Sequence, residues 1–442
     1  MQIYLVGGAV RDRLLGLECK DKDYVVVGAN PDKMLSLGYT QVGSQFPVFL
    51  HPDTHAEYAL ARTERKSGLG YKGFICDFSP DVSLDDDLIR RDLTINAIAY
   101  DEANDTYIDP TGGLDDLKNR VLRHISPAFC EDPLRILRVC RFAAKLHSFG
   151  FKIAQQTLDL MQSMTQSGEL ATLTPERVFL EIEKALNTPS PAVFFYLLHS
   201  IGALEYIMPE LEALHGVPGP KKWHPEIDSF VHTLMALDRI SYYSEDSVTR
   251  FAVLCHDLGK ALTPKELWPH HPDHGPHGIG PLKTMCARLK VPRAYEDFAS
   301  VVVYYHSFIH HLYDKGAEGI VSHFEDLDGY RRPERIKPFA LCCKADFLGR
   351  KGFENRPFPR SDYFLAMFSL TTTVKAAEFL AQGLKGPAIK EAMHQKRVKL
   401  VTEFLKMLPK TELDGSANAL PPDVLQSLEI EKKKEGLSAL II

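Results

Sequence analysis

Two carboxylates in the first thirty residues have a spacing that suits metal chemistry. Asp21 and Asp23 are separated by one residue and directly precede the apolar run 24–27. In a strand, residues two apart share one face, so both carboxylates can converge on one hard cation. Magnesium prefers a couple of carboxylates, with phosphate oxygens and water as its other ligands. The pair predicts metal-dependent transfer at a phosphate, with Glu57 in a later alternating run as a candidate third carboxylate.

A glycine turn lies upstream of this pair. Residues 1–6 have the pattern of a strand, and Gly7 and Gly8 allow the backbone to approach a phosphate before the next helix begins. Arg11 would add a charge-assisted contact. The carboxylate pair alone also fits a solvated turn. The glycine turn favours the other interpretation, which is binding of a nucleoside triphosphate and transfer of its nucleotide.

A stripe of charged residues begins at Asp132. Asp132 precedes a proline, which favours a helix start with Asp132 as N-cap, and Arg135, Arg138 and Arg141 follow at three-residue spacing. Cytosine and adenine present an exocyclic amine beside an unprotonated ring nitrogen, whereas uracil and guanine present a carbonyl beside an N–H. A carboxylate beside a guanidinium matches the first two bases. The segment can therefore select C and A, and a simple cap with a solvated arginine face is the alternative.

With the motif Arg90-Arg91-Asp92, these elements resemble the class II tRNA nucleotidyltransferases, which add C, C and A to tRNA 3′ ends. The resemblance extends from residue 1 into the 340s. It implies an enzyme with Mg²⁺ at the catalytic pair Asp21 and Asp23, with CTP and ATP as substrates and tRNA as partner. It also implies that Asp132 and Arg135 form a protein template for the base. The implied nucleotide-binding residues are Gly8, Arg11, Arg91, Asp132, Arg135, Arg138 and Arg141.

The second half of the chain carries a different set of metal-ligating side chains. Along the chain these side chains are a histidine, then a His-Asp pair, then a distant aspartate. This order resembles the order of the metal ligands in the HD superfamily of phosphohydrolases. That resemblance implies Ni²⁺ or another divalent transition metal and removal of phosphate from 2′,3′-cyclic, 2′- or 3′-phosphorylated ends. The mouth of the site is expected to include His274 and His306, with His277 as the alternative to His274. The implied ligands are His232, His256, Asp257 and Asp346.

The hydrophobic pattern predicts an α+β chain. A nucleotidyltransferase head with a small mixed sheet (1–140) precedes a mostly α-helical neck and body that binds tRNA (141–222), an all-α HD domain (223–350) and a helical extension (351–442). The basic, glycine-containing segment 62–73 is either a mobile loop or a solvated hairpin. Expected strands are 3–6, 23–27, 48–50 and 57–61, and expected helices include 10–15, 88–101, 364–384 and 388–408.

Composition limits the partners and the compartment. The chain has 442 residues and a formal net charge of −6, so an RNA partner needs a local basic strip. Arginines 135, 138, 141 and 177 and lysines 145, 152 and 184 offer one, and a solvated helix face is the alternative. Eight cysteines without a Cys-x-x-Cys pair indicate reduced thiols. We expect a cytoplasmic monomer or homodimer with no leader and no apolar run long enough for a membrane.

Three functions compete. The first is CCA addition to tRNA with an added phosphohydrolase. The second is a bacterial poly(A) polymerase, which shares the head motifs; the segment after the carboxylate pair lacks the basic Gly-Arg-Arg-Phe element of those enzymes. The third is a non-catalytic RNA-binding scaffold, which the complete acidic and arginine motifs disfavour.

Overall fold

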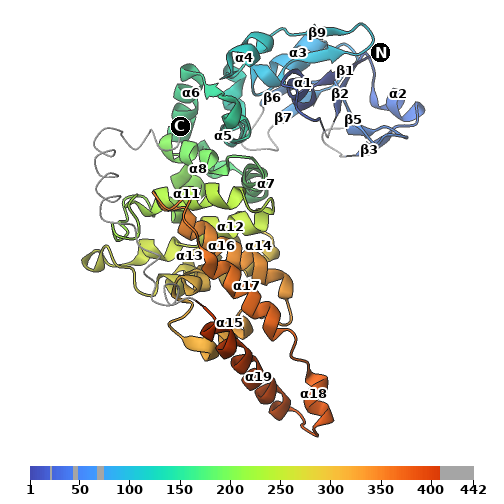
Figure 1. The fold of residues 1–442 in the computed structure, drawn as a ribbon. Helices are drawn as coiled ribbons and strands as arrows, with labels where there is room; N and C mark the ends of the chain where they lie inside the picture. The colour runs from blue at the N-terminus through green and yellow to red at the C-terminus, as the bar shows by residue number, and fades with distance from the viewer. Residues whose placement is uncertain (20–21, 43–47, 67–73, 409–442) are drawn as a thin grey trace. The chain divides into compact units, whose positions relative to one another are not determined.

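The computed structural model describes residues 1–19, 22–42, 48–66 and 74–408, and these residues form two compact units (Figure 1). Unit 1 comprises residues 1–189 and 197–207, and unit 2 comprises residues 190–196 and the chain from 208 onward. Helix α8 (Pro191–Ser200) runs through the division. The four segments expected from the sequence are a finer division than these two units and stay a prediction.

Unit 1 is built on a seven-stranded mixed sheet in the order β3-β4-β5-β2-β1-β8-β9. Strands β2 and β5 pair in parallel, whereas every other neighbouring pair in this sheet is antiparallel. The predicted mixed sheet is therefore confirmed. The strands are β1 Gln2–Val6, β2 Asp23–Val27, β3 Thr40–Val42, β4 Val48–Leu50, β5 Glu57–Leu60, β8 Ala99–Asp101 and β9 Thr106–Ile108.

Both faces of this sheet are covered, so its central strands are apolar at successive positions. On β1, Tyr4 and Val6 belong to one buried cluster with Leu88 of α3 (Leu84–Ile89). Leu5 belongs to a second cluster with Val10 of α1 (Gly8–Leu14). The alternation follows from the two-residue period of a strand. Because Leu5 and Val10 pack in the same cluster, the turn between β1 and α1 is held against the sheet.

The expected helix 88–101 is wrong. In its place, α3 ends at Ile89, a short 3₁₀ turn η2 spans Thr94–Asn96, and 99–101 form strand β8. Strand β8 pairs with β1, which lies more than ninety residues earlier, so a long-range pairing overrides the local pattern.

Further elements complete unit 1. Strands β6 and β7 form an antiparallel hairpin; residues 67–73 between them lie outside the described part of the chain. The bounds are β6 Thr63–Lys66, β7 Phe74–Asp77, β10 Val121–Leu122, β11 Lys152–Ile153, α2 Pro31–Ser36, α4 Gly113–Asn119, η3 Pro127–Glu131, α5 Leu134–Leu146, η4 His147–Phe149, α6 Gln155–Gln166, η5 Glu169–Thr172, α7 Pro175–Leu186 and α9 Leu204–Ile207.

Unit 2 is helical throughout its described residues. Helix α11 packs between α12 and α16, and α12 also packs on α14 (Figure 1). The bounds are α10 Pro209–Glu212, α11 Ser229–Ser241, α12 Ser247–Cys255, η6 Leu258–Leu262, η7 Lys265–Leu267, α13 His274–Leu289, α14 Arg293–Tyr305, η8 His306–His311, α15 Gly316–Asp326, η9 Pro333–Arg335, α16 Ile336–Leu348, α17 Pro359–Thr371, α18 Ala376–Ala381 and α19 Pro387–Lys406.

The segment 359–381 corrects two expectations. By length and composition it could cross a membrane, contrary to the expectation that no such run exists. It is divided into α17 and α18, however, so the single expected helix 364–384 is also wrong. Phe364 and Met367 are fully buried, and the Phe364 ring lies 4.8 Å from that of Phe324. Because a buried core helix meets the same criterion, the segment gives weak support for a membrane span.

Candidate functional sites

The glycine turn brings the first predicted binding residues to a cavity of unit 1. Gly7 has φ 70°, and α1 begins at Gly8 directly after it. Arg11, one turn into α1, is 2% exposed: its Nη1 donates to Asn96 Oδ1 at 2.7 Å, and its Nε donates to Asp12 Oδ1 at 2.8 Å. The guanidinium is therefore fixed in a buried polar network at the edge of the cavity.

Two carboxylates reach this cavity from neighbouring strands. Asp23 begins β2, and its register partner on the parallel strand β5 is Glu57. Both residues line the cavity, which makes Glu57 a carboxylate neighbour of the predicted catalytic position. Asp21, the other half of the predicted pair, lies outside the described residues. Carboxylate oxygens on adjacent strands are a suitable hard-donor set for magnesium.

The double arginine is held by a carboxylate that the sequence did not identify. Asp87 has no exposed surface; its Oδ1 accepts from Arg90 Nη2 at 2.5 Å, and its Oδ2 accepts from Arg91 Nη2 at 3.0 Å. Burial alone would raise the pKa of Asp87, but the charges of Arg91 and Arg90 hold it below its usual value. A Cβ added to Gly7 would lie 3.2 Å from Arg91 Nη1, so glycine keeps this approach open.

Asp132 and Arg135 also line the cavity, and the side chain of each has hydrogen-bond partners elsewhere in the unit. Asp132 Oδ2 accepts from Arg177 Nη2 at 2.7 Å, while Arg135 donates to the carbonyl oxygens of Arg90 and Ala128. Asp132 is also not the N-cap residue, because that position is taken by Pro133. Its Oδ1 still accepts from a backbone N–H in the first turn of α5 at 3.1 Å.

The other two predicted arginines also form ion pairs with carboxylates. Arg138 Nε donates to Asp92 Oδ2 at 2.7 Å, and Arg141 Nε donates to Glu181 Oε2 at 2.6 Å. Burial raises the pKa of Asp92, but the charges of Arg138 and Arg135 and the hydrogen bonds from Asn96 and Arg138 together hold the pKa below its usual range. The cavity has a volume of about 630 Å³ and includes all the predicted head residues within the described part of the chain: Gly8, Arg11, Asp23, Arg91, Asp132, Arg135, Arg138 and Arg141.

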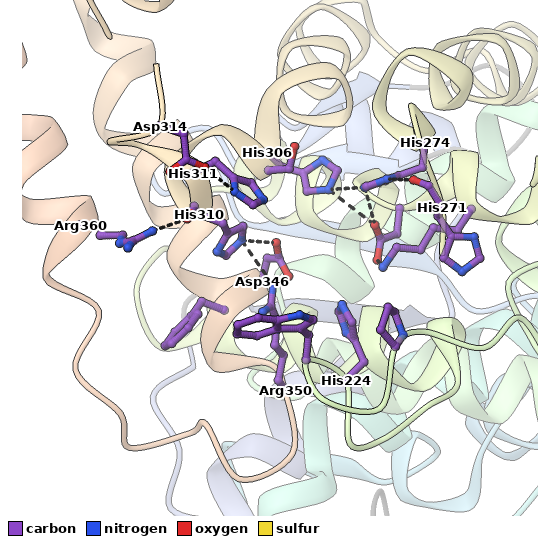
Figure 2. A pocket seen from close by; sticks show the side chains of 16 residues that line it. His224, His271, His274, His306, His310, His311, Asp314, Asp346, Arg350 and Arg360 are labelled. Carbon is purple, nitrogen blue, oxygen red and sulfur yellow. Dashed lines mark hydrogen bonds and ion pairs between the residues drawn. The ribbon is translucent and has the colours of Figure 1, made fainter. Parts of the chain in front are cut away.

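Unit 2 contains a second cavity of about 430 Å³; Asp257 and Asp346 of the predicted HD residues line it, and Figure 2 shows Asp346 there with His274 and His306. His232 comes from α11, and His256 and Asp257 follow the end of α12. Asp346 lies on α16. His232 Nε2 is 3.1 Å from Asp346 Oδ1 and 3.8 Å from Asp257 Oδ2, and His256 Nε2 is 3.2 Å from Asp257 Oδ2. The four residues are nearly inaccessible to solvent.

The donor atoms of this cluster fit a cation. His256 Nδ1 lies 2.7 Å from the Val253 carbonyl oxygen, so Nδ1 carries the hydrogen and the Nε2 lone pair faces the carboxylates. His256 Nε2 and Asp257 Oδ1 are buried and have no hydrogen-bond partner among the described residues. Buried acceptors without donors are costly unless a cation satisfies them. Imidazole nitrogens with carboxylates suit a divalent transition metal.

The two loop histidines differ in their position relative to the cavity. His274 lines the cavity and His277 does not. His274 Nε2 lies 3.1 Å from His306 Nε2, and both nitrogens lie 3.6 Å from Asp257 Oδ1. Burial lowers the pKa of both His274 and His306.

Several residues of this site were missed by the sequence reasoning. His310 Nε2 is 2.7 Å from Asp346 Oδ2, and Arg350 Nη2 donates to Asp346 Oδ1 at 3.3 Å. Glu226, which is 5% exposed, lies 3.0 Å from His232 Nδ1 through its Oε1. Arg350 follows Asp346 by four residues, a spacing that could have suggested this pair. His310 has no local signal, because Asp346 lies 36 residues away, and Glu226 precedes His232 by six residues across the start of α11.

Comparison with known proteins assigns the chain to a family. Residues 3–123 match the family described as "Poly A polymerase head domain", and residues 150–214 match "Probable RNA and SrmB- binding site of polymerase A". The "Multifunctional CCA protein" of Pasteurella multocida (strain Pm70) is 54% identical over 403 residues, which cover 90% of this chain and 96% of that protein.

Solved structures share the fold. The Bacillus stearothermophilus CCA-adding enzyme in complex with CTP matches with a TM-score of 0.60 at 22% identity, covering 98% of this chain and 93% of that one. The Thermotoga maritima CCA-adding enzyme, complexed with tRNA, matches with a TM-score of 0.57 at 18% identity, covering 97% and 91%. At these identities the structures show the fold alone. The 54% identity to the multifunctional CCA protein, along most of both sequences, shows that this chain belongs to the class II CCA-adding tRNA nucleotidyltransferases.

Proposed function

We propose that the unit 1 cavity adds the 3′-terminal CCA of tRNA from CTP and ATP. The observation that carries this proposal is the shared cavity of Asp23 and Glu57 with a wall of arginines. Mg²⁺, held by Asp23 together with Asp21 and phosphate oxygens, would activate the attacking hydroxyl and neutralise charge on the leaving pyrophosphate. Arg11 and Arg91, both held by carboxylates, bind the triphosphate.

We propose that Asp132 and Arg135 read the base. Asp132 accepts hydrogen bonds and can take the exocyclic amine of C or A, while Arg135 can donate to the ring nitrogen. Arg177 Nη2, 2.7 Å from Asp132 Oδ2, orients this carboxylate. Replacing Asp132 or Arg135 by Ala is expected to reduce discrimination against U and G by about tenfold or more, since a bidentate base contact contributes roughly 1–3 kcal/mol. The exposed Asp115→Ala on α4 is the control.

Single-nucleotide incorporation with each of the four triphosphates measures this. If the Asp132→Ala and Arg135→Ala variants keep the preference of the parent chain for C and A, the assigned roles are wrong. A second assay uses tRNA lacking its last three nucleotides with CTP and ATP. Defined CCA ends support the proposal, whereas an open-ended A tract supports poly(A) polymerase activity, and no extension supports a non-catalytic scaffold.

We further propose that the unit 2 cavity is a metal-dependent phosphohydrolase acting on 2′,3′-cyclic and 2′- or 3′-phosphorylated RNA ends. The convergence of His232, His256, Asp257 and Asp346 around unsatisfied buried acceptors carries this proposal. A divalent transition metal such as Ni²⁺ bound there would activate water for attack on phosphorus. Lys260, whose Nζ donates to Asp257 Oδ2 at 2.6 Å, lies at the cavity and adds positive charge toward a phosphate.

The test is hydrolysis of 2′,3′-cyclic AMP and of p-nitrophenyl phosphate with added Ni²⁺. His256→Ala and Asp257→Ala are expected to abolish turnover, whereas His277→Ala, on the same helix as His274 but outside the cavity, retains it. Full cyclic phosphodiesterase activity in either of the first two variants would contradict the assignment.

The two activities are chemically compatible. A 3′ end that carries a phosphate or a cyclic phosphate has no free hydroxyl for attack on a nucleotide, so its hydrolysis must precede extension. We propose that one chain repairs and then rebuilds tRNA ends, with tRNA, CTP and ATP as partners in the cytoplasm. Sedimentation would distinguish a monomer from a homodimer.

A further inference from the structure

A partly exposed tryptophan lies in the wall of the unit 2 cavity. Besides its histidines, the described part of this wall has two aromatic side chains, Trp223 and Phe347. Phe347 is 1% exposed, and its ring stacks on that of Phe358 with 4.3 Å between the centroids. Trp223 is only half-buried. The indole is therefore the aromatic surface that a bound molecule can contact.

Trp223 lies next to the metal-ligand cluster through its neighbour in the chain. The ring centroid of His224 is 4.5 Å from that of His232, and His224 Nδ1 is 2.9 Å from Glu226 Oε1. Adjacent Cα atoms are about 3.8 Å apart, so the indole belongs to the residue beside a ring that contacts the cluster. A ligand whose phosphate lies at the cluster can extend to Trp223 within one cavity of about 430 Å³. A cavity of this size suits a small organic molecule better than a bare phosphate.

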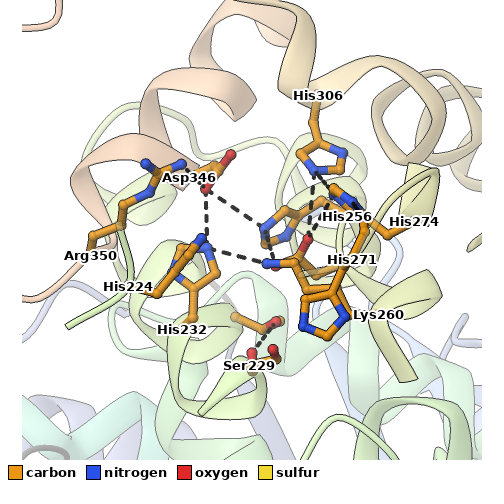
Figure 3. A network of polar contacts seen from close by, with 12 residues as sticks. His224, Ser229, His232, His256, Lys260, His271, His274, His306, Asp346 and Arg350 are labelled. Atoms are coloured by element: carbon orange, nitrogen blue, oxygen red, sulfur yellow. Dashed lines mark hydrogen bonds and ion pairs between the residues drawn. The ribbon is translucent and has the colours of Figure 1, made fainter. Parts of the chain in front are cut away.

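The loop that carries Trp223 is held in place by hydrogen bonds. The Trp223 backbone N–H donates to the Pro220 carbonyl oxygen at 2.9 Å. His271 Nε2 donates to the Pro218 carbonyl oxygen at 2.8 Å, and its Nδ1 accepts from Thr263 Oγ1 at 2.9 Å. Figure 3 shows His271 together with the residues of the metal-ligand cluster. An aromatic ring on a fixed loop loses little conformational freedom when a ligand binds.

The wall combines this aromatic surface with positive charge. Lys260 and Arg350 line the same cavity, and Lys222 Nζ lies over the Trp223 ring, 4.8 Å from its centroid. An indole can stack on any nucleobase, because every base has a π-face, and the cations suit a phosphate. None of the described residues in the wall has an amide side chain, the group best suited to reading an adenine edge. This combination fits a nucleoside phosphate with any base.

We propose that Trp223 stacks on the base of the nucleoside whose 2′- or 3′-phosphate is hydrolysed, so that the cavity selects nucleoside phosphates over other phosphate esters. This proposal rests on the phosphohydrolase assignment and names its specificity-determining residue. The stack accepts all four bases, whereas the function proposed for unit 1 requires selection of C and A. A damaged RNA end can therefore lose its phosphate whichever nucleotide it carries.

The first test compares substrates with and without a base. The full chain with Ni²⁺ is assayed on the four nucleoside 2′-monophosphates and on glycerol 2-phosphate, which has no base. Trp223→Leu keeps an apolar side chain but removes the ring. We expect its KM for all four nucleotides to rise by about tenfold, the range found for loss of one stacked base. Its kcat and KM for glycerol 2-phosphate should match the parent chain, and Trp223→Phe, which keeps a ring, should retain most of the nucleotide affinity.

The second test observes the indole directly. The chain has two tryptophans, so Trp268→Phe leaves Trp223 as the only fluorescent indole. Trp268 lies outside the cavity wall and donates to the Thr263 carbonyl oxygen, so this variant is also the control and should keep the parent kinetics. Adenosine, titrated into the full-length Trp268→Phe chain with Ni²⁺, should quench the fluorescence of Trp223. Glycerol 2-phosphate should leave it unchanged.

The outcomes separate this proposal from the assignment on which it rests. An unchanged KM for the nucleotides in Trp223→Leu, an equal loss on glycerol 2-phosphate, or no quenching by adenosine would overturn the stack and leave the phosphohydrolase assignment standing. A parent chain that hydrolyses none of these phosphates would overturn both. Circular dichroism checks the fold of each variant, and the fluorescence test does not depend on the folding of Trp223→Leu.

Discussion

Replacing Asp87 by Asn tests whether this buried carboxylate fixes Arg90 and Arg91, of which we propose that Arg91 binds the triphosphate. Asp87 accepts from Arg90 and Arg91, and its Oδ1 also accepts from the backbone N–H of Arg62 at 3.3 Å. Asparagine keeps the shape but removes the charge, so two guanidinium groups lose their shared counterion. Both stability and nucleotide binding should respond.

The size of the stability change follows from burial. Removing one partner of a fully buried ion pair costs about 3–5 kcal/mol. The side chains of Arg90 and Arg91 are 19% and 20% exposed, so they can regain some hydration. Asparagine also keeps hydrogen-bonding capacity. We therefore expect a loss of roughly 2–3 kcal/mol in unit 1, which lowers its melting temperature by about 4–12 °C for a unit of this size.

The functional change concerns Arg91, which lines the cavity beside Gly7. Without its anchor, the guanidinium must be ordered when the nucleotide binds. We expect the KM for CTP to rise by about tenfold, the equivalent of one weakened charge-assisted contact of roughly 1.4 kcal/mol. Steady-state extension of tRNA at varied CTP measures it. The control is Asp85→Asn, an exposed acid in the first turn of the same helix.

The pH dependence has a defined sign. Because the arginines lower the pKa of Asp87, its contribution to stability is present above the unfolded carboxyl pKa and is lost as pH falls through the lowered folded value. The Asn variant should lack this part of the acid transition. A melting temperature and a KM for CTP that match those of Asp85→Asn would refute the anchoring role.

Three further changes have distinct outcomes. A Cβ at Gly259 would lie 1.8 Å from a backbone oxygen of α13, so Gly259→Ala should either unfold unit 2 or abolish the proposed phosphohydrolase activity. The control is Gly280→Ala on α13, whose added Cβ meets nothing within 4 Å and should leave both the melting temperature and the activity unchanged. Glu226→Gln should weaken Ni²⁺ binding by about 10–100-fold in chelator competition, because the carboxylate 3.0 Å from His232 Nδ1 orients that ring; equal affinities would contradict this. Burial opposes protonation of His394, but two glutamates of α15 raise its pKa, so its stabilising contribution is complete below about pH 6.5 and is lost as pH rises through the raised value. Urea unfolding of His394→Gln should show a deficit of up to about 1 kcal/mol at pH 6 that shrinks at higher pH, and a pH-independent deficit would exclude this explanation.

Local sequence patterns predicted much of the fold and many of the residues that line the two cavities. The glycine turn and the strand that begins at Asp23 depend on neighbours a few residues away, and the structure has them where the sequence placed them. The stripe that begins at Asp132 also reaches the cavity as expected.

The rest depends on contacts between distant segments. Arg177 is 45 residues from Asp132, and His310 is 36 residues from Asp346, so no local spacing identifies either pair. Asp87 is the last of the three acidic residues 85–87, which lie in the first turn of α3. Its role as an arginine anchor comes from its burial, which the acidic pattern cannot predict.

The two cavities differ in the donor atoms they offer, and this difference separates their metals within one chain. On the described strands of unit 1 the cavity presents carboxylate oxygens from Asp23 and Glu57, which suit a hard ion such as magnesium. In unit 2 imidazole nitrogens dominate, and these favour transition metals over magnesium. Nickel at low concentration would therefore fill the unit 2 site first. We therefore expect nucleotide addition to continue on abundant magnesium, while the proposed phosphohydrolase activity responds to the supply of transition metal.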